Sequence, residues 1–293
     1  MRRYRDQTRG RANDVASHLV RGNRLSEHDQ ADLALVESRR RTPLRQYDQI
    51  PMVGDDLLRQ VILIAPYLRG RHVAFIGDYD GTASLLGLMS SRGAVPSPLT
   101  MGVLDFDGSV LRAVAEVARI GQFDDIVELH HYNVFDPLPP GLLGTFDTFY
   151  VNPPYGASNG GLSAELFVAR GLELVIADGS GVVVLPSDHH RPWSLDVVSR
   201  VQGSLADAGW RVVVSMPGIH RYVLDDDPGL MSGFFITEAG QLTRAEAMAL
   251  WQGRSIDDSE IPFFYGRGVS PPYPRLILDR GRVEDAGQDS GRV

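Results

Sequence analysis

The chain has 293 residues, a hydrophobic content of 43% and a formal net charge of -8. This length allows one large α/β domain with extensions, and the acidic balance excludes a uniformly basic nucleic-acid surface. No apolar run approaches the ~20 residues that a membrane helix needs. No apolar stretch follows the arginine-rich start and cysteine is absent, so we expect a cytoplasmic protein without a signal peptide, disulfides or thiolate metal sites.

The first segment, residues 1–45, is predicted to be a polar, helical arm. Ser26 followed by Asp29 is typical of a helix cap ahead of an apolar stretch. The chain contains no lysine, and many of its arginines lie in this segment: Arg2, Arg3, Arg5, Arg9, Arg11, Arg21, Arg24, Arg39, Arg40, Arg41 and Arg45. A basic arm on an acidic body can bind nucleic-acid phosphates, form an oligomer contact such as that of a homodimer, or be simply solvated. Composition leaves these alternatives open.

Behind the arm, the pattern of apolar residues predicts alternating strands and helices. A helical spacing within residues 46–70 predicts a helix ahead of the first strand. Further helices are predicted at residues 83–91, 110–119, 164–175 and 197–208. Short apolar runs predict buried strands at residues 72–76, 101–104, 126–130, 146–151, 181–185, 210–215 and 229–236. The predicted fold class is therefore α/β, a doubly wound, mostly parallel, seven-stranded Rossmann-like sheet whose last two strands are antiparallel.

The first predicted strand runs into a glycine-bearing turn that starts at Gly77 and leads into a helix. Such a turn lies on the ligand side of a doubly wound sheet, and its glycines let the backbone approach the ligand closely. Asp78 and Asp80 belong to this turn. Their carboxylates would repel a dinucleotide pyrophosphate, but they suit a cationic amine or sulfonium. The alternative is that these two acids are solvated loop residues.

Two further strand ends carry candidate ligand residues. Asp105, followed by Phe106, ends the second strand, where an acid can accept hydrogen bonds from two ribose hydroxyls. Asp107 is predicted to cap the next helix. The loop after the third strand contains Asn133 and Val134, which we expect to hydrogen-bond and pack against an adenine ring unless the loop is simply exposed.

The fourth strand is followed by Asn152-Pro153-Pro154-Tyr155. Two consecutive prolines fix φ and donate no hydrogen bonds, so this corner is stiff and its carbonyls point outward. Asn152 offers a side-chain carbonyl, and Tyr155 offers a flat face for stacking. Such a corner can hold an amino group between the Asn152 oxygen and the Pro153 carbonyl; the alternative is an ordinary proline-rich turn.

Two polar clusters remain. His189 and His190 are adjacent and cannot both face one metal ion in a simple geometry, so we predict no metal site and expect one of the pair to line the substrate pocket beside Trp193. The acidic stretch Asp225 to Asp227 is either a solvated turn or a site that collects a polycation. Residues 46–238 are predicted to form the catalytic domain, residues 239–281 an extension with a helix at 244–251, and residues 282–293 a disordered tail.

The order of these motifs resembles that of class I S-adenosylmethionine-dependent transferases, and the corner resembles the Asn/Asp-Pro-Pro-Tyr motif of the amino-methyltransferases among them. From about residue 47 to 236 the chain resembles the branched-chain polyamine synthase family, the N4-bis(aminopropyl)spermidine synthases. The matching pieces are Asp48-Gln49-Ile50-Pro51, Ile76-Gly77-Asp78-Tyr79-Asp80, Val103-Leu104-Asp105-Phe106-Asp107, Pro137-Leu138-Pro139 and Pro153-Pro154-Tyr155. That family transfers aminopropyl groups from decarboxylated S-adenosylmethionine to a secondary amine. Its loop is richer in acids and its corner begins with Asp, where this chain has Tyr79 and Asn152.

The resemblance implies a role for each candidate residue. The cofactor, S-adenosylmethionine or its decarboxylated form, is expected at Gly77, Asp78, Asp80, Asp105, Phe106, Asn133 and Val134. The accepting amine is expected at Asn152, Pro153, Pro154 and Tyr155.

The acceptor is harder to predict. A polyamine nitrogen has a pKa near ~10 and must lose a proton before it attacks, and Asn152 cannot be the base, whereas an exocyclic nucleobase amine is already neutral. We therefore expect first an S-adenosylmethionine-dependent N-methyltransferase acting on a nucleobase amine or a small amine. The alternatives are an aminopropyltransferase making branched polyamines and a catalytically silent binding protein with this fold.

Overall fold

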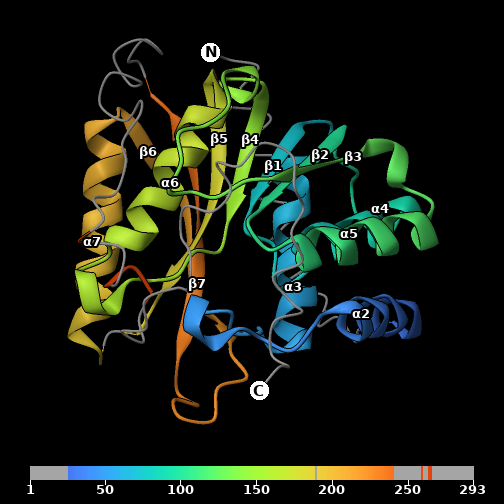
Figure 1. Ribbon diagram of the computed structural model, residues 1–293, viewed down its shortest axis with the longest axis horizontal. Coiled ribbons are helices and arrows are strands. Elements are labelled where there is room, and N and C mark those ends of the chain that lie inside the picture. The colour runs from blue at the N-terminus through green and yellow to red at the C-terminus, as the bar shows by residue number, and fades with distance from the viewer. Residues whose placement is uncertain (1–25, 189, 241–258, 260–262, 266–293) are drawn as a thin grey trace, which may run out of the picture.

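The computed structural model describes residues 26–188, 190–240, 259 and 263–265. The rest of the predicted arm, His189, the predicted helix at 244–251 and the predicted tail lie outside these residues. The centre of the molecule is one seven-stranded sheet with the strand order β3-β2-β1-β4-β5-β7-β6 (Figure 1). None of the helices in the described ranges has the length and apolarity needed to cross a membrane.

The sheet is parallel except at one end. Its strands are β1 (His72–Ile76), β2 (Thr100–Asp105), β3 (Val127–His131), β4 (Phe146–Val151), β5 (Val175–Pro186), β6 (Trp210–Arg221) and β7 (Met231–Ala239). Strands β1 to β5 pair in parallel, and β7 pairs antiparallel with both β5 and β6. The strand order reverses between β1 and β4, and a doubly wound sheet binds its ligand outside the carboxyl ends of the strands at such a switch point. The predicted fold class is confirmed.

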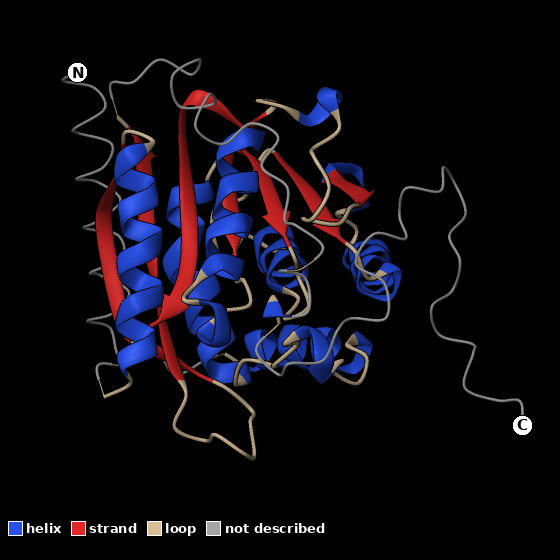
Figure 2. Cartoon of the chain, turned by 60° about the vertical axis from the view of Figure 1, so that its left-hand side comes forward, coloured by secondary structure: helices blue, strands red, loops and turns tan. Residues whose placement is uncertain are grey.

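Helices cover both faces of this sheet (Figure 2). They are α2 (Glu27–Arg39), α3 (Gly54–Leu68), α4 (Thr82–Ser91), α5 (Gly108–Gly121), α6 (Leu162–Leu174) and α7 (Pro192–Asp207). Helices α3, α4 and α5 pack on one face and α6 and α7 on the other. Each face of the sheet has its own hydrophobic core, the first under α3, α4 and α5 and the second under α6 and α7. Side chains alternate along a strand, so Val73 and Phe75 of β1 belong to the first core, and Ala74 and Ile76 belong to the second.

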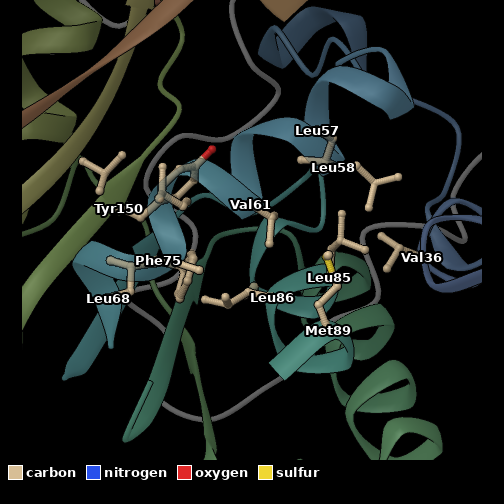
Figure 3. Close-up of a cluster of buried hydrophobic side chains, with 14 of the residues drawn as sticks. Val36, Leu57, Leu58, Val61, Leu68, Phe75, Leu85, Leu86, Met89 and Tyr150 are labelled. Atoms are coloured by element: carbon tan, nitrogen blue, oxygen red, sulfur yellow. The ribbon is translucent and has the colours of Figure 1, made fainter. Parts of the chain in front are cut away.

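The described part of the arm is packed against the domain. Ser26 and Asp29 form the predicted cap, in which each side chain accepts a hydrogen bond from the other residue's amide. Leu33 and Val36 of α2 are buried in the core formed by α3, α4 and α5, and Figure 3 shows Val36 at the edge of this cluster. Helix α2 is therefore part of the same packed fold, and it brings Arg40 and Arg41 close to the loop after β1.

Two helical glycines form a matched pair for testing the packing. A Cβ added at Gly171 of α6 would lie 2.4 Å from the buried Phe149 ring of β4, whereas a Cβ at the exposed Gly203 of α7 would meet nothing within 4 Å. We expect Gly203→Ala to raise the free energy of unfolding by about 0.5–1 kcal/mol through helix propensity. Gly171→Ala should lower it by about 1–3 kcal/mol through overpacking. Urea unfolding measures both, and equal effects of the two variants would contradict this packing.

Candidate active site

A cavity of about 440 Å³ opens at the carboxyl ends of β1, β2 and β4. Parallel strands end at the same edge of the sheet, which is why residues far apart in the sequence meet there. Of the residues predicted to bind the cofactor or the accepting amine, all but one lie in the cavity wall: Gly77, Asp78, Asp80, Asp105, Phe106, Val134, Asn152, Pro153, Pro154 and Tyr155. The exception is Asn133.

The loop between β1 and α4 brings two buried acids into the cavity. Gly77 and Gly81 take positive φ values of 72° and 78°, which let the chain turn sharply at both ends of the loop. The Asp78 carboxylate accepts the Ala83 amide at 3.2 and 3.3 Å, so it occupies the N-terminus of α4, where an anionic ligand would otherwise bind. Burial, reinforced by the charges of Asp80 and Asp105, raises the pKa of Asp78 well above its usual range.

Asp80 connects the loop to the proline corner. Its carboxylate accepts one hydrogen bond from the Met52 amide and one from the Asn152 side-chain nitrogen, both at 2.8 Å. Burial raises the pKa of Asp80, and the positive charge of Arg40 opposes that rise. Arg40 also donates to the Asp80 carbonyl oxygen at 2.7 Å and lies 5.9 Å from the centre of the Tyr79 ring. The Asn152 side-chain nitrogen therefore donates a hydrogen bond within the protein. Although the corner begins with an amide, the carboxylate of Asp80 lies next to it.

Asp105 lies at the end of β2, in the wall of the same cavity. Its two oxygens accept the Asp78 amide at 3.0 Å and the Asp107 amide at 2.8 Å. Burial raises the pKa of Asp105 to about 7. The predicted role of Asp107 as a helix cap is confirmed, because its carboxylate accepts the Ser109 amide at the start of α5. The ribose contact predicted for Asp105 stays a prediction.

An aromatic bay adjoins Asp105. Its wall contains Tyr47, Phe106, Tyr132, Val134, Phe167 and Tyr265. Tyr47 meets the rings of Phe106 and Tyr265 edge to face, at centroid distances of 5.0 and 5.4 Å. The sequence did not indicate Tyr47 or Tyr265, because one precedes the sheet and the other lies in the predicted C-terminal extension.

The loop after β3 places its two predicted residues differently. Val134 lies in the bay as predicted, but the Asn133 carbonyl oxygen turns back to accept the Phe135 amide at 3.1 Å, and Asn133 is not part of the wall. Short Asn side chains commonly bond in this way to the backbone two residues on. The fully buried Arg170 fixes this loop from behind by donating to the Val134 carbonyl at 3.0 Å.

The proline corner faces a second group of aromatic residues. The Tyr155 hydroxyl lies 2.5 Å from the Tyr222 hydroxyl, and the Tyr155 ring lies over Trp193 with a centroid distance of 6.5 Å. Both partners line the cavity, as was expected of Trp193. His190 is exposed and does not line it. Tyr222, which directly follows β6, was missed because the sequence pattern predicted that this strand ends at residue 215.

The cavity wall is acidic. Its carboxylates are those of Asp48, Asp78, Asp80, Asp105, Asp226 and Asp227, and within the described residues it includes no arginine or histidine. Of the acidic turn between β6 and β7, Asp226 and Asp227 reach the cavity and Asp225 does not. Asp226 pairs with Arg45 at 3.4 Å, and Asp227 pairs with Arg191, so these two acids are partly neutralised. No three metal-ligating side chains of the described residues converge on one point.

Comparison with known families matches residues 32–226 to the branched-chain polyamine synthase A C-terminal domain. This match covers more than half of the chain. It confirms the predicted resemblance to the branched-chain polyamine synthase family.

Two curated proteins are similar over shorter stretches. N(4)-bis(aminopropyl)spermidine synthase of Thermus thermophilus is 26% identical over 181 residues, which are 61% of this chain and 49% of that protein. The rRNA N(6)-adenosine-methyltransferase metl-5 of Caenorhabditis elegans is 25% identical over 135 residues, which are 46% of this chain and 63% of that protein. The chain thus spans about half to two thirds of the length of these relatives.

A solved structure shares the fold. The branched-chain polyamine synthase C9 mutein of Thermus thermophilus, in complex with N4-aminopropylspermidine and 5'-methylthioadenosine, superposes with a TM-score of 0.62 and 21% identity. The superposition covers 81% of this chain and 69% of that one.

The raised pKa of Asp105 makes stability depend on pH. Because the folded-state pKa of about 7 lies above the ordinary value of 3.8, this group's contribution to stability is lost as the pH rises through about 7. Asp105→Asn removes that dependence. Between about pH 5 and pH 8, the free energy of unfolding of the variant should gain about 1–3 kcal/mol relative to the wild type. Denaturant unfolding at several pH values measures the difference, with Asp225→Asn as the control, and a pH-independent difference would contradict the assignment.

Proposed function

Because the chain belongs to the family of the branched-chain polyamine synthase A C-terminal domain, a family of S-adenosylmethionine-type transferases, we propose that it transfers an aminopropyl group from decarboxylated S-adenosylmethionine to an amine of a polyamine. The observation that carries this proposal is the charge of the cavity wall. Six aspartates line it, and the described wall has no basic side chain. Such a wall favours ligands that are cationic along their length.

The proposed cofactor would occupy two parts of the cavity, the aromatic bay and the region next to Asp78. The aromatic bay suits an adenine ring, and we infer that Asp105, which lines the same cavity, accepts hydrogen bonds from the ribose hydroxyls. The carboxylate of intact S-adenosylmethionine would meet Asp78, which already occupies the N-terminus of α4. A decarboxylated cofactor has no such group and presents an ammonium instead. When bound, the cofactor supplies an electrophilic carbon next to a sulfonium and a neutral thioether as the leaving group.

The chain supplies a base and an orienting corner. Asp80 is a buried carboxylate of raised pKa, which suits removal of a proton from a protonated amine. Asn152 donates to Asp80 at 2.8 Å, so its carbonyl oxygen stays available as an acceptor for an N–H of the same amine. The Pro153 carbonyl and the Tyr155 ring complete the corner. Alignment of the amine lone pair by these groups contributes to the rate.

This proposal reverses the order of the two sequence-based hypotheses. Asn152 was expected to disfavour a protonated acceptor because an amide is not a base. The carboxylate of Asp80 lies against that amide and removes the objection. Methyl transfer to a neutral amine is the second candidate, and it is favoured by the Asn152 amide itself, which can accept from an amine that needs no base. Nucleic-acid binding by the arm stays a prediction, since the segment before residue 26 lies outside the described residues.

Calorimetry with the two cofactor forms, followed by turnover assays, tests this assignment. We expect the decarboxylated form to bind more tightly than intact S-adenosylmethionine, and the protein to alkylate spermidine in its presence. Asn152→Ala should reduce turnover at least about a hundredfold and leave cofactor affinity within about threefold, because the corner positions only the amine. Tighter binding of the intact form, with methylation of an adenosine-containing RNA, would replace the proposal by the second candidate. Binding of neither form would leave the silent-fold hypothesis.

Arg40 provides a pH-based test of Asp80 as the base. Arg40→Gln removes the positive charge that holds the pKa of Asp80 down, so that pKa should rise further. At a given pH a smaller fraction of Asp80 is then ionised, and the acid limb of the rate profile should move to higher pH. Arg39→Gln is the matched control, because Arg39 pairs with Glu116 on the outside of the domain. An unchanged profile in Arg40→Gln would show that Asp80 is not the base.

A further inference from the structure

Four side chains form a hydrogen-bonded chain that leads from the cavity into the sheet. Tyr155 bonds to Tyr222 at 2.5 Å, Tyr222 bonds to the Ser232 hydroxyl at 2.8 Å, and Ser232 bonds to the Nδ1 atom of His220 at 3.0 Å. Tyr155 and Tyr222 line the cavity, whereas Ser232 and His220 are fully buried on β7 and β6. His220 and Tyr222 are two residues apart and so point to the same side of the chain.

The hydrogen-bonded chain ends at His220. The Nε2 atom of His220 is buried and has no hydrogen-bond partner within the described residues. The ring stacks on Phe234 at a centroid distance of 6.2 Å. Burial lowers the pKa of His220 to about 4, against the charge of Asp56 and together with that of Arg59. His220 is therefore neutral at physiological pH, and one of its nitrogens carries hydrogen while the other has a lone pair.

A neutral imidazole at the end of the chain sets the direction of every hydrogen bond in it. If Nδ1 of His220 is the acceptor, Ser232 donates to it, Tyr222 donates to Ser232, and Tyr155 donates to Tyr222. The Tyr155 oxygen can then only accept further hydrogen bonds, because its own hydrogen is used. If Nδ1 carries the hydrogen, each bond reverses and Tyr155 becomes a donor toward the cavity.

We propose that His220, through Ser232 and Tyr222, holds the Tyr155 hydroxyl as a hydrogen-bond acceptor for an N–H of the bound polyamine. This inference rests on the proposed function, because a polyamine presents only N–H donors to the cavity and therefore needs acceptors. Asp80 and the Asn152 carbonyl take the two N–H hydrogens of a protonated secondary amine, and Tyr155, three residues further, offers an acceptor to another nitrogen of the same molecule. His220 and Ser232 touch no ligand in this arrangement and are positioning residues.

The tautomer of His220 tests the direction of the chain without any turnover. With the histidines of the whole protein labelled with nitrogen-15, the protonated ring nitrogen and the one with a lone pair have distinct chemical shifts. The His220 signals are identified by their loss in His220→Asn. We expect hydrogen on Nε2 and none on Nδ1. Hydrogen on Nδ1 would overturn the proposal, because Tyr155 would then be a donor.

Kinetics of Ser232 variants test the positioning role. Ser232→Ala removes the middle hydroxyl without changing the cavity wall. We expect the kcat/KM for the amine to fall about tenfold, and the affinity for the cofactor, which lies against other strands, to stay within about twofold. Ser232→Thr keeps the hydroxyl and should restore most of the loss. Thermal unfolding of both variants is measured alongside, and equal losses of Tm, cofactor affinity and turnover would show a structural role only.

Failure of this inference can be told from failure of the proposed function. Wild-type protein that alkylates no amine would defeat the proposed function, and the His220 tautomer would still decide the direction of the chain. Normal amine kinetics in Ser232→Ala, in an enzyme that does alkylate polyamines, would defeat the positioning role alone.

Discussion

The carboxylate of Asp80 is the interaction on which the rest of the site depends. It joins the loop after β1 to the Met52 amide ahead of α3 and to Asn152 after β4, while Arg40 at the end of α2 holds the same loop by its backbone. A buried carboxylate is costly unless its oxygens accept hydrogen bonds, and both oxygens of Asp80 do. The same bonds fix the orientation of the Asn152 amide, so the requirement to satisfy one buried charge determines which atom the corner presents to a ligand.

The crowding of acids connects this architecture to the kind of ligand it can accept. Burial raises the pKa values of Asp78, Asp80 and Asp105, and mutual repulsion adds to the rise at Asp78. A bound cation relieves that repulsion, whereas an anion intensifies it. Arg45 and Arg191 pair with Asp226 and Asp227 of the cavity wall, but neither arginine is part of that wall. Among the described residues, the charged side chains that line the cavity are therefore all acidic.

Most of the site could be predicted from the sequence because parallel strands end at a common edge. Asp78, Asp105 and Asn152 each follow a buried apolar run, and tertiary structure could place these ends only side by side. The site residues that could not be predicted come from other segments. Tyr265 follows the last strand of the sheet in the sequence. Tyr222 follows β6, an edge strand with many partly exposed residues, whose end could not be predicted from the sequence pattern. Neither place follows from local periodicity. The bond between Asn152 and Asp80 was also hidden, because it depends on side-chain orientation across two strands.

The wall of the aromatic bay has a consequence for how this protein can diverge from its relatives. Phe264 packs against Phe135 at a centroid distance of 4.6 Å and is anchored by its carbonyl to the Ser163 hydroxyl, which places the neighbouring Tyr265 in the bay. Both residues lie beyond position 226, where the region shared with the family ends. Under the proposed function, part of the wall around the cofactor's base is thus encoded outside the segment that matches the family. A substitution at Phe264 or Tyr265 can therefore change the aromatic bay while the proline corner at residues 152–155 stays the same.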